Sequence, residues 1–199
     1  MSARGLPGLT LEKFLQALGS KTPSPGGGAV AAVAGASGAA LLLMAAEYSE
    51  WPAGTEDPRA RLKELAVELL GLAQEDAVAY AAYSEARNRK KEDPAGYAGA
   101  LGEIARVPLT ACERAVEALG KVPSIIARAP KWFACDVAIA TSSLETAATG
   151  TRLLAGINVA FLAAGAREAL AARLAAAEGE LERCTRANAP LLLRALPGK

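Results

Sequence analysis

A glycine-rich turn that leads into a long uncharged segment constrains the fold of this chain more than any other feature. Residues 21–28 read Lys-Thr-Pro-Ser-Pro-Gly-Gly-Gly, and residues 29–46 carry no charged side chain. The prolines disfavour helix before the junction, and the glycines leave backbone N–H groups uncovered at the positive end of the helix dipole. The junction therefore predicts a long apolar helix whose first turn either receives an anion or allows close packing.

The composition favours closely packed helices. Hydrophobic residues make up 52% of the 199 residues but aromatic residues only 5%. Alanine, which is abundant along the whole chain, has the highest helix propensity and lets helix axes approach closely. Proline and glycine separate long periodic segments rather than short β-branched runs, which argues against a sheet. We predict an all-α fold, a single-domain bundle of long antiparallel helices over residues 1–199.

Charge and cysteine usage exclude several classes of function. A formal net charge of +1 gives no reason to expect nucleic acid as a partner. Residues 29–46 are as long as the shortest membrane spans, but Ala, Gly and Ser predominate and no cationic or aromatic belt flanks them, so we expect no membrane partner. Three separated cysteines and no histidine argue against zinc and disulfide frameworks and favour a reducing cytoplasm. Residues 1–8 do not resemble a secretory signal.

Periodicity and capping residues divide the chain into predicted helices. Gly165 is expected to interrupt the helical structure between the last two helices, and Pro108 to kink the fourth helix. Pro190 is expected to begin a short tail. The predicted helices cover residues 11–18, 27–50, 58–87, 94–119, 124–128, 134–164 and 166–187.

One carboxylate interrupts an apolar stripe on the third predicted helix. Leucines 62, 65, 69 and 72 are followed at helical spacing by Asp76, Tyr80 and Tyr83. An aspartate that faces a core or an interface needs a partner or a raised pKa, and either marks a possible site. The alternative is a carboxylate that bonds to a neighbouring helix end or a tyrosine for structural reasons only.

Few other residues are suited to acid–base chemistry or anion binding. Without histidine, proton transfer falls to Asp, Glu, Lys, Tyr, Cys or water. Asp136 lies near the start of a predicted helix, where an acid stabilises the helix without any catalytic role. Arg106, Arg152 and Asn158 lie in helices otherwise rich in small and apolar residues, and each can either bind a carboxylate or face solvent.

Six segments, read together, resemble a known family. They are residues 9–18, 22–32, 75–77, 107–109, 135–138 and 157–159. Their order and spacing are similar to those of the cyclodeaminase and methenyltetrahydrofolate cyclohydrolase helical domain, which also forms the C-terminal part of formiminotransferase-cyclodeaminase. The resemblance implies an all-helical homodimer with a folate site near the glycine turn and the subunit interface. It also implies one-carbon chemistry, either ammonia loss from 5-formiminotetrahydrofolate or water addition to 5,10-methenyltetrahydrofolate.

The resemblance suggests a role for each candidate residue, without a metal or any cofactor beyond the folate substrate. Asp76 and Asp136 are expected to act as acid and base, with Lys21 in a lesser catalytic role. The residues expected to bind substrate are Ser24, Gly26, Gly27, Gly28, Arg106 and Asn158. Residues 48–52 and 128–135 depart from the family pattern, so the alternative is a non-catalytic helical dimer that keeps the fold and binds folate or another anion.

Overall fold

The computed structural model describes residues 5–195, and every regular element in that range is a helix. The all-α prediction is therefore confirmed. The elements are η1 (Leu6–Gly8), α1 (Leu11–Leu18), α2 (Gly27–Glu47), α3 (Arg59–Asn88), α4 (Pro94–Leu119), α5 (Val122–Ile126), η2 (Lys131–Phe133), α6 (Ala134–Val159) and α7 (Ala164–Ala195).

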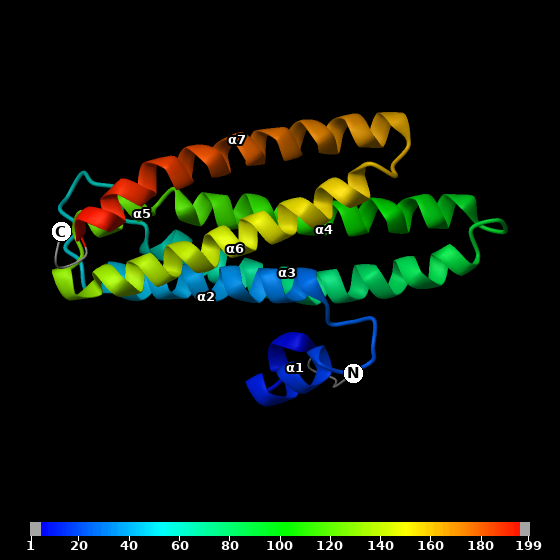
Figure 1. Ribbon diagram of the computed structural model, residues 1–199, viewed down its shortest axis with the longest axis horizontal. Coiled ribbons are helices and arrows are strands. Elements are labelled where there is room, and N and C mark those ends of the chain that lie inside the picture. The colour runs from blue at the N-terminus through cyan, green and yellow to red at the C-terminus, as the bar shows by residue number, and fades with distance from the viewer. Residues whose placement is uncertain (1–4, 196–199) are drawn as a thin grey trace.

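Four long antiparallel helices form the centre of the fold (Figure 1). Helix α2 packs on α3 and α6, and α4 packs on the same two helices, so the four enclose a common core. Helix α7 covers α4 and α6, whereas α1 lies on the opposite side (Figure 1), where its Phe14 belongs to a small apolar cluster with Ala29 of α2 and Ala73 of α3. The start of α2 and the end of α6 consequently lie at the same end of the bundle, although more than a hundred residues separate them in the sequence.

Leucine and alanine fill the core in the pattern that the sequence predicts. Leu62, Leu65 and Leu69 on α3 are completely buried, and Leu72 is nearly so. Burial of each such side chain contributes about 1.5–3 kcal/mol relative to exposure. The stripe that ends in Asp76 therefore faces the bundle interior, and the aspartate lies where the apolar core gives way to a cavity.

Helix α2 packs very closely against α6 because its residues are small. A Cβ atom added at Gly38 would lie 2.8 Å from the carbonyl oxygen of Ala140 on α6, so only glycine permits this approach. By length and composition α2 is apolar enough to cross a membrane, but 56% of its most apolar stretch is buried in the bundle. Its composition is thus explained in large part by packing.

Several helix boundaries differ from those predicted, including that of the short helix α5, which covers Val122–Ile126 rather than residues 124–128. The break before the last helix falls at residues 160–163, and Gly165 lies in the first turn of α7. Leu162 fixes this connection because its side chain is buried against Leu101 and Ala105 of α4. Helix α2 ends at Glu47 rather than at residue 50, since the indole N–H of Trp51 donates to the carbonyl of Ala46.

The predicted tail at Pro190 is also wrong, because α7 continues through this proline to Ala195. Proline removes only one backbone hydrogen bond. Tertiary contacts hold the helix on both sides of it: Asn188 donates to the carbonyl of Leu119, 3.2 Å away, and Leu192 packs against the main core.

Candidate functional site

The carboxylate of Asp76 lies against the first turn of α2. The backbone N–H of Ala29 hydrogen-bonds to it. A Cβ atom on Gly28 would collide with the carboxylate, at 2.5 Å from its Cγ and 2.6 Å from its Oδ2. The third glycine of the turn is therefore required by the approach of Asp76, and this side chain is itself an anion at the positive end of α2.

Burial raises the pKa of Asp76 above its ordinary value of 3.8, and the hydrogen bond from Ala29 opposes this shift only in part. Among residues 5–195, no arginine or lysine contributes to the shift. A carboxyl group with a raised pKa and no cationic partner exchanges a proton more readily near neutral pH than an ordinary aspartate does. Asp76 thus contacts the start of α2, as the structural interpretation expects, and its raised pKa is the property that an acid–base role requires.

Asp76 opens onto a cavity of about 300 Å³ where α2, α3, α4 and α6 meet. The cavity has apolar and aromatic walls with a few polar groups, as expected of a site for a small organic molecule. Its lining residues are Pro23, Ser24, Gly26, Gly27, Gly28, Asp76, Tyr80, Tyr83, Ile104, Pro108, Leu154 and Asn158.

Besides Asp76 and the two tyrosines, two polar side chains line this cavity, those of Ser24 and Asn158. The Oγ atom of Ser24 is buried and has no hydrogen-bond partner among the described residues. Asn158 donates from Nδ2 to the backbone carbonyl of Ile104, at 2.7 Å. The structure therefore brings Ser24, the three glycines, Asp76 and Asn158 to one place, as the sequence-based site requires.

Three other predicted site residues lie outside the cavity. Lys21 is exposed and does not line it. Arg106 pairs with Glu103 at 2.7 Å and with Glu75 at 3.6 Å, beside a separate groove between α3 and α4. Asp136 lies at the opposite end of α6 from Asn158, about 33 Å away at about 1.5 Å per residue. Within one chain, Asp76 and Asp136 are thus not neighbours.

Sequence reasoning missed several lining residues. Tyr80 and Tyr83 follow Asp76 at four and seven residues, so the stripe placed them on its face without identifying them as part of a site. Ile104, Pro108 and Leu154 gave no chemical signal, because only the tertiary packing brings them to the cavity.

The cysteines and acidic residues form no metal site in the described part of the chain. No group of three or more Cys, Asp or Glu side chains there is placed to hold a metal ion. Cys112, Cys135 and Cys184 are all unpaired thiols. Burial raises the pKa of Cys112 to about 11, which makes this thiol unreactive at neutral pH.

The outer sides of α2 and α6 form a continuous, largely uncharged face. Each helix presents an outward stripe at intervals of three and four residues, the spacing by which helices pair. The stripe on α2 consists of Val30, Ala34, Ser37, Leu41 and Met44, and it continues to Tyr48, the residue that directly follows the helix. The stripe on α6 consists of Ile139, Ser143, Thr146, Gly150, Leu153 and Ile157. We call these two stripes together the α2–α6 face.

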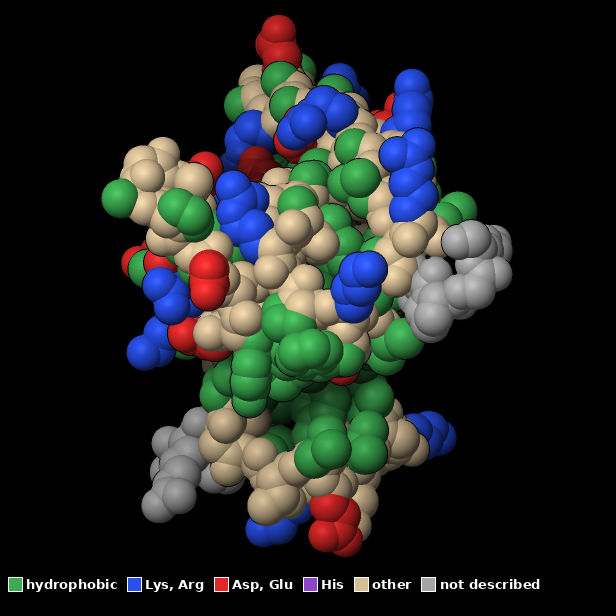
Figure 2. Space-filling view, turned by 90° about the vertical axis from the view of Figure 1, so that its left-hand side faces the viewer, with side chains coloured by type: hydrophobic (Ala, Val, Ile, Leu, Met, Phe, Trp, Pro, Cys, Tyr) green, Lys and Arg blue, Asp and Glu red, His purple; other side chains and the backbone are tan. Residues whose placement is uncertain are grey.

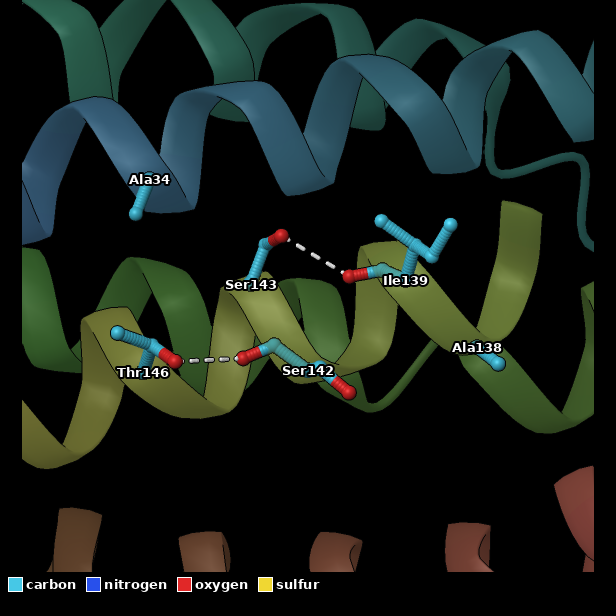
Figure 3. Close-up of a pocket in the computed structure, with 6 residues that line it drawn as sticks. All are labelled: Ala34, Ala138, Ile139, Ser142, Ser143 and Thr146. Carbon is cyan, nitrogen blue, oxygen red and sulfur yellow. Dashed lines mark hydrogen bonds between the residues drawn. The ribbon is translucent and has the colours of Figure 1, made fainter. Parts of the chain in front are cut away.

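Two views show the character of this region. A shallow depression of about 420 Å³ lies between Ala34 and the α6 residues around Ser143 (Figure 3). The hydroxyls of Ser143 and Thr146 donate to carbonyls of their own helix, so they present little unsatisfied polarity (Figure 3). Viewed from the end where α6 begins, hydrophobic side chains gather at the level of α2 and α6 (Figure 2). Large apolar side chains exposed in this way typically mark an interaction surface.

The fold and the cavity together define a helical-bundle protein with an internal cavity whose wall includes a half-buried carboxylate. Residues 10–177 match the formiminotransferase-cyclodeaminase family, and the chain belongs to this family.

Two relatives support the assignment. The chain is 34% identical over 117 residues to a methenyltetrahydrofolate cyclohydrolase of Methylorubrum extorquens, a match that covers 52% of this chain and 56% of the relative. The chain thus matches little more than half the length of that relative. The fold is similar to that of formiminotetrahydrofolate cyclodeaminase from Thermotoga maritima, with a TM-score of 0.83 and 23% identity over 94% of this chain and 96% of that one.

Proposed function

We propose that this chain is an enzyme of one-carbon metabolism that acts on a tetrahydrofolate derivative, as a formiminotetrahydrofolate cyclodeaminase or a methenyltetrahydrofolate cyclohydrolase. The observation that carries the proposal is the half-buried Asp76 carboxylate, with its raised pKa, at the glycine turn of a cavity large enough for one ring system. Family membership and the names of both relatives support the same substrate class. The setting we propose is the cytoplasm.

Either reaction needs one group that accepts a proton and returns it. In cyclodeamination N10 attacks the carbon of the protonated formimino group and loses its proton, and the leaving –NH2 takes up one proton and departs as ammonia. In cyclohydrolysis water adds to the methenyl carbon and loses a proton. The resulting hydroxyl then loses its proton while N5 is protonated and the bond from the carbon to N5 breaks, which gives the 10-formyl product. Asp76 is suited to accept the proton in both cases, since a base with a pKa nearer the working pH is more effective. The proposed reaction uses neither a metal nor a further cofactor.

We further propose that two copies pair through the α2–α6 face. This face is mostly apolar, with a few hydroxyl side chains, and carries no charged side chain in either stripe. Asp136 and Asn158 lie at nearly equal distances on either side of the middle of the α6 stripe. A two-fold axis through that middle therefore brings the Asp136 end of one protomer to the cavity end of its partner. The dimer thus brings Asp136 of one protomer to the Asp76 cavity of its partner, whereas within one chain Asp136 lies about 33 Å from Asn158 of that cavity.

The function is tested by incubating the purified protein with 5,10-methenyltetrahydrofolate and following its absorbance. A parallel assay measures ammonia release from 5-formiminotetrahydrofolate. We expect enzyme-dependent turnover of one of the two. Binding of both without turnover would favour the alternative, a non-catalytic dimer that retains the folate site.

The shared site is tested by mixing two inactive variants, Asp76→Asn and Asp136→Asn. Random exchange of subunits should restore about a quarter of the wild-type activity, because each mixed dimer contains one site with both aspartates. No recovery after verified exchange would refute the shared site. Ile139→Asp should yield monomers in sedimentation experiments, whereas Val67→Asp, on an equally exposed residue of α3, should not.

A further inference from the structure

Pro108 and Asn158 form a matched pair in the wall of the cavity. Pro108 lies inside α4 and carries no N–H, so the carbonyl of Ile104, four residues earlier, has no partner within its own helix. Asn158 on α6 donates to this carbonyl from Nδ2 at 2.7 Å. A side chain on one helix thus replaces the backbone hydrogen bond that a proline removes from another.

This hydrogen bond determines which way the amide of Asn158 points. If the amide were reversed, Oδ1 would take the place of Nδ2 and lie about 2.7 Å from the carbonyl oxygen of Ile104. Two hydrogen-bond acceptors repel each other at this distance. Oδ1 accepts no hydrogen bond from the described residues. Unlike the Oγ atom of Ser24, it is not fully buried. Asn158 therefore retains an accessible acceptor of fixed orientation at the cavity wall.

Asn188 shows the same arrangement without a cavity. Its Nδ2 also donates to a helix carbonyl, that of Leu119, but its Oδ1 is buried and has no partner in the described part of the chain. The two asparagines differ in what lies beyond the oxygen. At Asn188 there is packed protein, whereas at Asn158 there is the open cavity.

We infer that Asn158 is a specificity residue whose Oδ1 accepts a hydrogen bond from an N–H group of the ligand, and that Pro108 is the positioning residue that fixes this polarity. The inference rests on the proposed function, in which the ligand is a tetrahydrofolate whose reduced pterin carries ring N–H and amino donors. A site built to accept from an N–H group discriminates strongly against ligands that lack it.

The test is a double-mutant cycle with Asn158→Ala, Pro108→Ala and the double variant. Asn158→Ala leaves the Ile104 carbonyl without a partner, so it lowers the free energy of unfolding. In Pro108→Ala, residue 108 regains an N–H that can bond to this carbonyl and release Asn158. The double variant should therefore recover much of the stability lost by Asn158→Ala alone.

The same variants report on ligand binding. Asn158→Ala should weaken tetrahydrofolate binding, or raise KM, about tenfold, the effect of losing one hydrogen bond, with kcat changed much less. Pro108→Ala should weaken binding in the wild-type background and have little further effect once Asn158 is absent. Thr149→Ala, on an exposed residue of α6 that does not line the cavity, is the matched control and should change neither quantity.

Each outcome distinguishes this inference from the proposed function. Independent, additive effects of the two substitutions on stability would refute the pairing of Pro108 with Asn158. Unchanged tetrahydrofolate affinity in Asn158→Ala would refute the role of Oδ1. A wild-type protein that binds no tetrahydrofolate would overturn the proposed function and the ligand specificity together, while rescue by Pro108→Ala would still decide the pairing.

Discussion

Replacement of Gly28 by alanine tests whether the glycine turn exists to admit Asp76. The added Cβ would lie 2.5–2.6 Å from Cγ and Oδ2 of the carboxylate, whereas ordinary contacts are 3.4–4 Å. The carboxylate must therefore withdraw by about 1 Å, which breaks its hydrogen bond with Ala29. Loss of a hydrogen bond to a charged group lowers the free energy of unfolding by about 1.5–3 kcal/mol. The higher helix propensity of alanine raises it by up to about 1 kcal/mol.

The net expectation for Gly28→Ala is a loss of about 1–2 kcal/mol in the free energy of unfolding, or a Tm about 2–8 °C lower in a chain of this size. Displacement of Asp76 by about 1 Å should also reduce kcat/KM for the folate substrate by about 100-fold. Differential scanning calorimetry and steady-state kinetics measure the two effects.

Gly27→Ala is the matched control for stability. A Cβ at Gly27 meets no atom within 4 Å, so this variant should unfold at the wild-type temperature or slightly above it. If Gly28→Ala is as stable and as active as the wild type, Asp76 does not require the glycine and the proposed geometry is wrong.

Three further predictions concern the same helices. Asp76→Asn should alter the pH dependence of stability. Burial raises the pKa of Asp76 in the folded state, so protonation of this group stabilises the folded wild type below pH 3.8. This stabilisation is lost as the pH rises through the folded-state pKa. The stability of the asparagine variant relative to wild type should therefore increase from pH 3.8 towards 7 in paired urea titrations, and a constant difference would contradict the shift. Gly38→Ala should lower the free energy of unfolding by about 1–3 kcal/mol, because its Cβ would press on the carbonyl of Ala140, and a neutral result in urea titration would show that α2 and α6 separate easily. Gly71→Ala should raise the free energy of unfolding by up to about 1 kcal/mol, since its Cβ meets open space within α3, and a lower Tm would contradict this.

The sequence predicted most of the fold because the helix signals are local. Asp93 before Pro94 caps α4 as expected, with its side chain accepting from the backbone N–H of Gly96. The predictions at Gly165 and Pro190 are wrong because contacts with distant segments outweigh the local tendency of glycine and proline to end a helix. Leu162 makes such contacts near Gly165, and Asn188 makes them near Pro190. Whether a glycine or a proline ends a helix depends on packing that one segment does not encode.

The site was predictable only in part, for a related reason. Asp76 could be identified because a carboxylate in an apolar stripe is anomalous within a single helix. The pairing of Pro108 with Asn158 depends on two helices that are distant in the sequence, and neither residue alone indicates it. The positions of Arg106 and Lys21 outside the cavity likewise follow from the arrangement of helices rather than from their own segments.

Turnover by Asp76→Asn tests the central proposal most directly. Asparagine keeps the shape of the side chain and can still accept a hydrogen bond from Ala29, but it cannot accept a proton. With the variant shown to be folded by circular dichroism and to bind tetrahydrofolate, we expect kcat for the folate substrate to fall at least about 100-fold. Wild-type kcat in this folded variant would contradict the assignment of Asp76 as the proton acceptor.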